Sequence, residues 1–316
     1  MKNPLTLKTT ALYAVLLSCL AVCCFLFSGC DDHEVCAKCN AAFAKERKVK
    51  QIVYYDNTNT LKEKYRFYYQ DNLVDSIVKI SYGGASLKTA GSDSVVTNLK
   101  VYYASKECIP SSYTAKTYIP ASPVSVEKAF FSVSGSNINN KHLAFYPDED
   151  FLVVDKTADI DYTYDGSGRV STRKGTDYGI LVWPNIYGNE NFYTYTGNNL
   201  THVVAQKEQA GYNLDLTFDG RNNPFGIQAG VLYYLNLTSY PDDEYFETLP
   251  RDRNNPTKIV YKGTDTSNSF VTITFTFTYS YDVLSYPAKV NIHESKDDDV
   301  HGDSETDHGT YLFSYY

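Results

Sequence analysis

The chain has 316 residues, 43% of them hydrophobic, and its 29 basic and 37 acidic side chains give a formal net charge of −8. This acidity excludes a nucleic-acid or anionic-membrane surface built on a broad basic face, and the composition excludes collagen, coiled coil and intrinsic disorder. Tyrosine is in excess, with 30 Tyr and 16 Phe beside a single Trp. Tyr and Phe favour pleated, half-buried strands, so the composition predicts an all-β fold.

Residues 1–29 have the pattern of an export signal. Lys2 and Lys8 are their only charged side chains, and an apolar run follows from Ala11 to Phe27. A basic start, a short apolar stretch and small residues before a cut site are typical of a secretory signal peptide. The run is marginal in length for a membrane span, so we expect residues 1–29 to be removed.

The apolar run ends in Phe27-Ser28-Gly29-Cys30. This segment resembles the bacterial lipoprotein signal, in which the peptidase cuts before a cysteine that then receives lipid. The resemblance implies lipid attachment at Cys30, and a protein that is held on a membrane without spanning it. The alternative is an ordinary secretory signal followed by an unrelated cysteine.

Acidic residues follow directly, at Asp31, Asp32 and Glu34. In lipoproteins of Bacteroides-type bacteria, such a cluster resembles the signal for display on the outer surface. In other Gram-negative bacteria, an Asp after the lipid-bearing cysteine resembles a signal for retention at the inner membrane. We expect a lipid-anchored protein of the outer membrane, displayed on the cell surface, with the periplasmic face as the other orientation.

Three cysteines remain in the mature chain: Cys36, Cys39 and Cys108. Haem attachment to the C-x-x-C pair would require a His where Asn40 stands, and zinc would have His33 but no evident fourth ligand. The sequence therefore predicts a local disulfide or thiols without a role, with no metal and no cofactor.

The segment from Glu34 to Lys50 is charged and reads as a short helix within a tether that spans residues 30–49. A single all-β domain is expected over residues 50–316. Its clearest strand is 271–281, where odd positions are apolar or aromatic and even positions are Thr or Ser. This alternation with a period of two places the two classes on opposite faces of a sheet.

A weak repeat runs through the domain: an aromatic strand, a polar turn, and a short returning strand. Asp-Gly, Gly-Asn and Asn-rich turns supply positive φ angles, so the repeat predicts antiparallel hairpins. Two echoes support duplication, Arg-Asn-Asn-Pro at 221–224 and 253–256 and Ser-Tyr-Pro at 239–241 and 285–287. The hairpin copies lie at 65–77, 162–170, 192–203, 214–227 and 277–290.

Adjacent aromatics such as Tyr68 and Tyr69 place rings on both faces of the sheet. This pattern favours one long antiparallel sheet curled into a barrel or half-barrel. With its lipoprotein signal, the Asn-Pro-Phe turn at 223–225 and the serial hairpins, the chain resembles a Bacteroides-type outer-membrane lipoprotein family of unknown function. That resemblance implies a porin-like all-β domain over residues 50–316, and it brings no catalytic residues with it.

Catalytic motifs such as G-x-S-x-G, H-E-x-x-H and the P-loop are absent from the sequence. Ser171 and Lys174 match S-x-x-K, but they lie on an expected strand and lack the partner motifs. The acidic groups 148–150 and 242–244 are the candidate carboxylate pair of a hydrolase, since glycosidases need two carboxyl groups a few ångströms apart. We expect them to be solvated turns.

A further acidic segment extends from Asp297 to His308. Closely spaced oxygen ligands can hold Ca²⁺, but the EF-hand spacing is missing. The prediction is a mobile hairpin loop between strands at 289–293 and 310–316.

These observations favour a non-catalytic structural or binding module, anchored to the outer membrane and serving nutrient or glycan capture. Its partner class is a glycan or another envelope protein, and nucleic acid is excluded. The alternative is an anchored hydrolase of glycosidase type. A third hypothesis, an integral outer-membrane barrel, is disfavoured because charged side chains such as Lys62, Glu63 and Lys64 interrupt the strands.

Overall fold

The computed structural model describes residues 47–70, 72–82, 94–103, 109–135, 137–149, 154–175, 190–206, 211–223, 225, 254–264, 270–298, 300 and 302–316. Within these ranges, no helix is long and apolar enough to cross a membrane.

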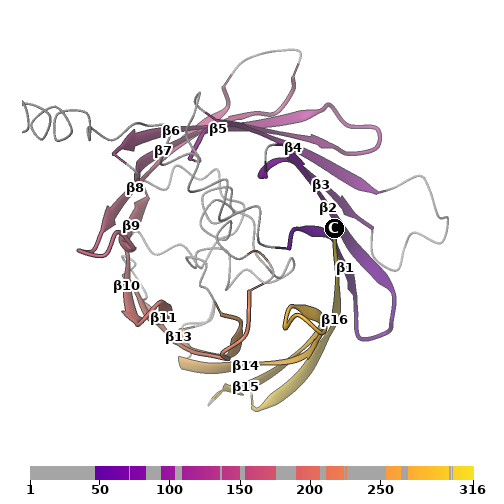
Figure 1. Ribbon diagram of the computed structural model, residues 1–316, viewed down its shortest axis with the longest axis vertical. Coiled ribbons are helices and arrows are strands. Elements are labelled where there is room, and N and C mark those ends of the chain that lie inside the picture. The colour runs from indigo at the N-terminus through magenta and orange to yellow at the C-terminus, as the bar shows by residue number, and fades with distance from the viewer. Residues whose placement is uncertain are drawn as a thin grey trace, which may run out of the picture.

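Sixteen antiparallel strands form a closed barrel, each paired with its neighbours along the chain (Figure 1). The strands are β1 (Val49–Tyr55), β2 (Leu61–Gln70), β3 (Leu73–Ser81), β4 (Val95–Tyr103), β5 (Pro110–Tyr118), β6 (Ser125–Ser134), β7 (Asn137–Tyr146), β8 (Lys156–Tyr164), β9 (Val170–Gly175), β10 (Glu190–Thr196), β11 (Asn199–Gln206), β12 (Tyr212–Phe218), β13 (Pro256–Thr264), β14 (Phe270–Tyr281), β15 (Pro287–Asp298) and β16 (Ser304–Tyr315).

The ring closes where β1 pairs with β16, with Ile52 opposite Phe313 and Tyr54 opposite Tyr311. The rings of Tyr54 and Tyr311 stack there with centroids 4.5 Å apart. The all-β prediction is confirmed, and of the two shapes expected the closed barrel is correct. Closure satisfies the backbone groups that an open sheet would leave at its edges.

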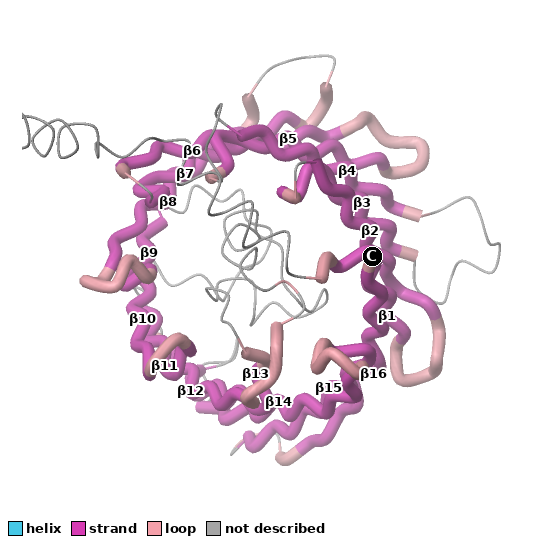
Figure 2. The backbone as a smooth tube through the Cα atoms, in the orientation of Figure 1, coloured by secondary structure: helices cyan, strands magenta, loops and turns pink. Residues whose placement is uncertain are grey.

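Alternation along each strand gives the barrel two chemically different faces. One face carries the buried apolar core, and its members from β2 and β14 include Phe67 and Phe275. Phe225, which follows β12, packs on Phe67 of β2 with ring centroids 5.5 Å apart. Because β2 and β12 are not neighbours in the barrel, this contact crosses the interior, and the buried face is therefore the inner wall. Figure 2 shows these strands forming an uninterrupted ring around the lumen.

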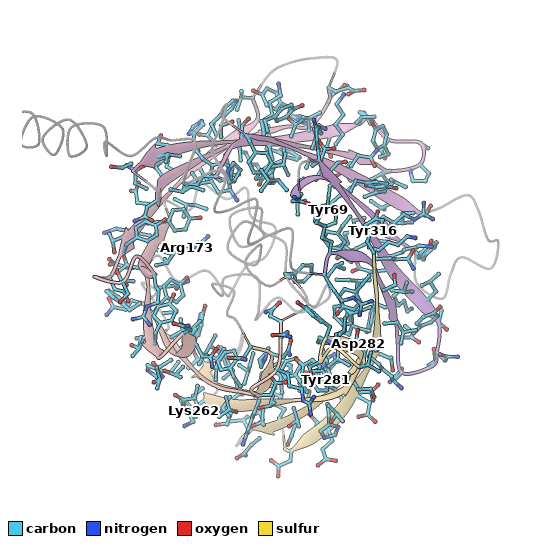
Figure 3. The ribbon with its side chains drawn as sticks, in the orientation of Figure 1. Tyr69, Arg173, Lys262, Tyr281, Asp282 and Tyr316 are labelled. Atoms are coloured by element: carbon cyan, nitrogen blue, oxygen red, sulfur yellow. The ribbon has the colours of Figure 1, made fainter. Side chains whose placement is uncertain are left out.

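The other face is the outer wall, which is polar and exposed. Figure 3 shows Arg173 on the inner side of the ring and Lys262 on the outer side. On β14 the division is complete, because Val271, Ile273 and Phe275 are buried while the alternating Thr residues reach the outer wall. The strand predicted at 271–281 is therefore confirmed, with both of its faces.

The expected helix over residues 34–50 is wrong at its C-terminal end. No helix occurs in the described residues, and Val49 and Lys50, placed at the end of the expected helix, begin β1 instead. The rest of that expected helix lies outside the described residues. Val49 is buried in the core and pairs with Tyr315 of β16. The local sequence could not predict this pairing, because β16 lies at the other end of the chain.

The return strand of the fourth hairpin copy was also wrongly placed. It was expected at Pro224, yet β12 pairs with β13, which begins at Pro256. The second Arg-Asn-Asn-Pro copy thus supplies the returning strand, and Phe225 turns into the core instead. Identical local sequences carry identical turn signals, so only long-range pairing distinguishes them.

Candidate functional site

Both described termini lie at one end of the barrel, which we call the terminal end. The Tyr316 amide donates to the Lys48 carbonyl at 3.0 Å, fixing the two termini side by side. The connections β2–β3, β6–β7, β8–β9, β10–β11 and β14–β15 turn at this same end. The other end, where β1 turns into β2, is called the opposite end.

Every odd-numbered strand contains a register shift close to the terminal end. In each case the odd strand has one residue more than the even strand that precedes it along the chain. For β1, the shorter partner is β16, with which β1 closes the barrel. Such a β-bulge raises the local twist and interrupts the hydrogen-bond ladder. The additional residues are Lys50, Asp75, Ser111, Asn139, Ser171, Thr201, Thr257 and Ala288.

Tyrosines join six of these bulged odd strands to the even strand that follows each of them along the chain. On six even strands, a Tyr near the terminal end donates its hydroxyl to a carbonyl near the start of the preceding odd strand. Tyr69 reaches the Val49 carbonyl at 2.9 Å, and Tyr195 reaches that of Val170 at 2.9 Å. We call this set the tyrosine rim; its members are Tyr69, Tyr103, Tyr164, Tyr195, Tyr279 and Tyr315.

The rim residues pack against the core with their rings and use their hydroxyls on the backbone. Burial raises the pKa of Tyr69, because the charged phenolate would lose its hydration. The hydroxyl therefore stays protonated and remains a donor. The tyrosine excess of the composition thus has a specific structural use at this end.

Cations cover the rim from the side of the turns. The guanidinium of Arg169 lies 4.5 Å from the centroid of Tyr195, and that of Arg47 lies 4.7 Å from Tyr315. Each is a cation–π contact, worth about 0.5–1 kcal/mol at an exposed site. The Lys48 amine is 5.7 Å from the Tyr69 ring centroid.

Aspartates that directly follow an aromatic residue organise the turns. Asp165 accepts the amides of Ser167 at 2.8 Å and Arg169 at 3.0 Å. Gly168, the fourth turn residue, has a φ of 76°. A short polar side chain that takes two turn amides fixes such a loop. Hydrogen bonding from Arg169 lowers the pKa of Asp165, which keeps the carboxylate ionised.

The same five-residue turn occurs at 282–286 and, at the opposite end, at 56–60. Asp282 accepts the amides of Leu284 at 2.8 Å and Tyr286 at 3.0 Å. The fourth residues, Ser285 and Asn59, have φ angles of 63° and 60°. One local rule therefore builds turns at both ends.

A fourth copy of this turn is split by an insertion. Asp219 accepts the amide of Arg221 at 2.9 Å, as expected, but the next amide comes from Asn255 at 3.2 Å. Asn255 then donates its side chain to the Asn222 carbonyl at 3.0 Å. Residues of the two Arg-Asn-Asn-Pro copies thus lie side by side and together complete the turn.

Buried polar groups on the inner wall form local pairs. Glu63 accepts hydrogen bonds from Tyr65 at 2.8 Å and Ser81 at 3.0 Å, and Lys79 lies 2.7 Å away. This cluster satisfies a carboxylate inside the wall.

Polar side chains of neighbouring strands pair on the outer wall. His142 on β7 lies 2.9 Å from Asp159 on β8, directly opposite in register. His202 on β11 lies 2.7 Å from Asp215 on β12, which Lys262 on β13 approaches to 3.6 Å. These polar contacts lie within the strands β7, β8 and β11 to β13.

The residues expected to anchor and export the protein, Cys30, Asp31, Asp32 and Glu34, lie outside the described residues. So do His33, Cys36, Cys39 and Cys108, the candidate carboxylates 242–244, and Asp150. Where the chain is described, no group of three His, Cys, Asp or Glu side chains could hold a metal ion.

Two other sequence candidates acquire structural explanations. Glu149 pairs with Lys116 at 2.7 Å, as a surface ion pair. Ser171 is the additional residue of the β9 bulge and lies 2.8 Å from the Thr163 hydroxyl. Lys174 is on the same strand but 4.0 Å from Glu190, so each member of the S-x-x-K match has its own partner.

The acidic segment 297–308 is a hairpin, but its loop is shorter than expected. β15 continues to Asp298 and β16 begins at Ser304. Asp298 is buried and pairs with Lys296 at 2.8 Å, while Asp307 lies 2.8 Å from His293. Asp307 thus pairs across the hairpin, and Asp298 pairs with a lysine of its own strand.

The sequence signal for the rim was present but incomplete. The repeated aromatic strand before a polar turn identified Tyr69, Tyr164 and Tyr195 as equivalent positions. It could not identify their acceptors, which lie 20 to 29 residues away on another strand.

No protein-family model matches the sequence, and no curated protein does. Among solved structures, a porin-like protein from Bacteroides uniformis ATCC 8492 has a TM-score of 0.49 and 10% identity, covering 85% of this chain and 98% of that one. A porin-like protein from Bacteroides vulgatus ATCC 8482 has a TM-score of 0.37 and 11% identity, covering 86% and 99%. A likeness this distant concerns the course of the strands alone.

Proposed function

We propose that this protein is a lipid-anchored envelope barrel, held at the outer membrane through Cys30 and acting as a non-catalytic structural or binding module. The proposal combines the lipoprotein signal that ends at Cys30 with the chemistry of the barrel wall. Nutrient or glycan capture, with a glycan or an envelope protein as partner, is the role we assign to that module.

The charged outer wall is the observation that carries the proposal. A barrel embedded in lipid needs an apolar band, and a Lys or Arg facing the bilayer centre costs about 2–4 kcal/mol. Here Asp215, Lys262 and the pair of His142 with Asp159 occupy the outer face. A wall of this kind favours water on the outside and a lipid chain as the attachment.

Fractionation of two secreted forms tests the anchor. In the variant, residues 1–29 are replaced by an ordinary secretory signal and Cys30→Ala removes the acceptor of the lipid. We expect the native form to stay with membranes after a carbonate wash and the variant to be released. Retention of the folded variant after the wash would contradict the proposal and indicate a barrel that spans the membrane.

Display is tested separately on whole cells. If the protein faces outward, added protease digests the native form while a periplasmic marker stays intact. Replacing Asp31, Asp32 and Glu34 with Ala, with Cys30 kept, should preserve the membrane attachment and lose the digestion. Unchanged digestion would show that these acids do not direct display.

A further inference from the structure

At the terminal end, the exposed apolar side chains lie on one sector, while the opposite end separately exposes Tyr118, Ile119, Val154, Phe270 and Val300. On the outer wall, Tyr68 on β2 is 42% exposed, Tyr102 on β4 is 47% exposed and Phe130 on β6 is 51% exposed. Leu312 on β16 is also exposed, three residues before the rim residue Tyr315. Small residues intervene, because Ser112 pairs with both Tyr102 and Phe130, so the rings project from the wall.

The turn between β14 and β15 extends this sector at its tip. Val283 is 98% exposed and Leu284 is largely exposed, and the C-terminal Tyr316 is exposed as well. With Tyr68, Tyr102, Phe130 and Leu312, these residues define what we call the apolar sector. It runs over β14–β16 and β1–β6, which are consecutive around the closed ring.

The far side of the same end is different. The outward residues next to the rim on β8, β10 and β12 are Thr163, Thr194 and Thr217, all exposed. The asymmetry therefore belongs to one half of the end, and β1 lies in the middle of that half. Figure 3 shows Tyr69 and Tyr316 together on this side of the ring.

Basic side chains accompany the exposed rings. Lys50, the additional residue of the β1 bulge, is exposed and lies 5.4 Å from the Tyr316 ring centroid. Arg66 is exposed on β2, and Lys100 is close to both Tyr68 and Tyr102 in register. Tyrosine rings beside Lys and Arg are the combination that settles at the interface between lipid headgroups and acyl chains.

The position of Arg47, the first described residue, indicates that a lipid bilayer covers this sector. The described chain begins at Arg47, in the middle of the sector, and only 16 residues separate it from Cys30. Even fully extended, that segment reaches no more than about 60 Å. A lipid at Cys30 therefore keeps the terminal end near a bilayer, where burial of exposed apolar area is favourable.

We propose that the apolar sector is a membrane seat: the half of the terminal end around β1 rests in the headgroup region of the bilayer that holds the lipid anchor. This inference rests on the proposed function, since it requires anchoring at Cys30. The barrel would then lean on the membrane on this side, with the wall around Asp215 and Lys262 in water and its opposite end directed away.

Tryptophan reporters in the full, lipidated protein test this seat. Tyr68→Trp, Tyr102→Trp and Phe130→Trp place a reporter in the sector, and Tyr118→Trp and Phe270→Trp place matched exposed reporters at the opposite end. Each variant is reconstituted into phosphatidylcholine–phosphatidylglycerol vesicles, with or without brominated acyl chains. The emission of the unsubstituted protein is subtracted to remove Trp183.

We expect the three sector reporters to shift to shorter wavelength on vesicles and to lose emission with brominated lipid, while the two controls do neither. Vesicle flotation in the same samples reports the anchor. If the protein floats but the sector reporters behave like the controls, the seat is overturned and the anchor stands. If the protein does not float, anchoring itself fails, and the proposed function fails with it.

Discussion

The two ends of the barrel are built in different ways. At the terminal end, each of the eight odd strands carries the same one-residue bulge, and six tyrosines connect neighbouring hairpins through the backbone. At the opposite end, the described pairings shift register at Tyr54/Tyr55 and at Ile292/His293. The bulge and the tyrosine bond repeat at one end, whereas the described register shifts at the other end occur at individual pairs.

This difference bears on how a chain of similar hairpins closes into a barrel with one strand register. Repetition at the terminal end makes each hairpin like the next, which alone would permit several registers. The individual contacts at the opposite end then select one. A change at an individual contact should accordingly cost more than a change to one copy of the repeat.

Gly309 should show the largest effect. It has a φ of 107°, and an added Cβ would overlap the Tyr55 carbonyl oxygen. We expect Gly309→Ala to lower the free energy of unfolding by about 3 kcal/mol or more, from backbone strain and overpacking. The control is Gly197→Ala at the terminal end, where φ is 60° and the added Cβ meets nothing within 4 Å.

Urea unfolding of both glycine variants makes the measurement. The Gly197 variant should lose only about 1 kcal/mol, the cost of a left-handed backbone conformation. Equal losses in the two variants would remove the distinction between the ends.

Tyr69→Phe tests one copy of the rim. The variant keeps the ring but loses the hydroxyl that donates to the Val49 carbonyl at 2.9 Å. We expect a loss of about 1 kcal/mol, because one hydrogen bond disappears and a partly buried carbonyl loses its donor. Tyr68→Phe is the matched control, since Tyr68 is the adjacent residue and projects from the outer wall.

Thermal unfolding compares these two variants in the same buffer. The midpoint should fall for Tyr69→Phe and stay near that of the native protein for Tyr68→Phe. If both behave alike, the rim bonds do not stabilise the barrel.

The shared Asp turn predicts an acid response at the opposite end. The Thr58 hydroxyl, the Thr60 amide and nearby Lys62 lower the pKa of Asp56 to about 2, against burial effects that raise it. Because the folded pKa lies below the usual 3.8, the turn's contribution to stability is complete above about pH 4 and is lost as the pH falls toward 2.

Carboxyl carbon NMR of Asp56 follows that titration directly. Thr58→Ala removes the largest cause and should move the pKa of Asp56 upward, toward 3.8. Thr278→Ala, on the outer wall of β14, serves as the control and should leave the Asp56 titration in place. An unchanged pKa in Thr58→Ala would mean that the hydroxyl does not hold the turn.

Lys262→Met should have the smallest effect. Its amine lies 3.6 Å from Asp215 on the exposed wall between the two ends. Exposed ion pairs contribute about 0–1 kcal/mol and are screened by salt. We expect a change in unfolding free energy within about 0.5 kcal/mol that vanishes at high salt. A large loss that persists in salt would show that the wall pairs stabilise the barrel.

Local features of the fold could be predicted because they depend on neighbours in sequence. The alternation in residues 271–281 identified β14 and both of its faces. The aromatic strand followed by a polar turn identified four of the five hairpin copies with their returning strands. The turn at 162–169 works through contacts between residues four apart at most, which a sequence pattern can carry.

Features that depend on distant partners could not be predicted. The fourth copy failed because the turn at Asp219 is completed by Asn255, 36 residues later. The extent of the strands in the acidic segment at 297–308 depends on the pairing of β15 with β16, which places Asp307 beside His293. The apolar sector is spread over strands that are far apart in sequence.

By itself, the sequence determined that this chain is built of antiparallel hairpins rich in tyrosine, since strand alternation and turn chemistry are local properties. Tertiary structure alone decided that β1 meets β16, which face lines the lumen, and which carbonyl each rim tyrosine satisfies. Those outcomes depend on closing the ring, which brings together residues separated by nearly the whole chain. Backbone groups at the edges find partners only then, and this requirement selects the barrel.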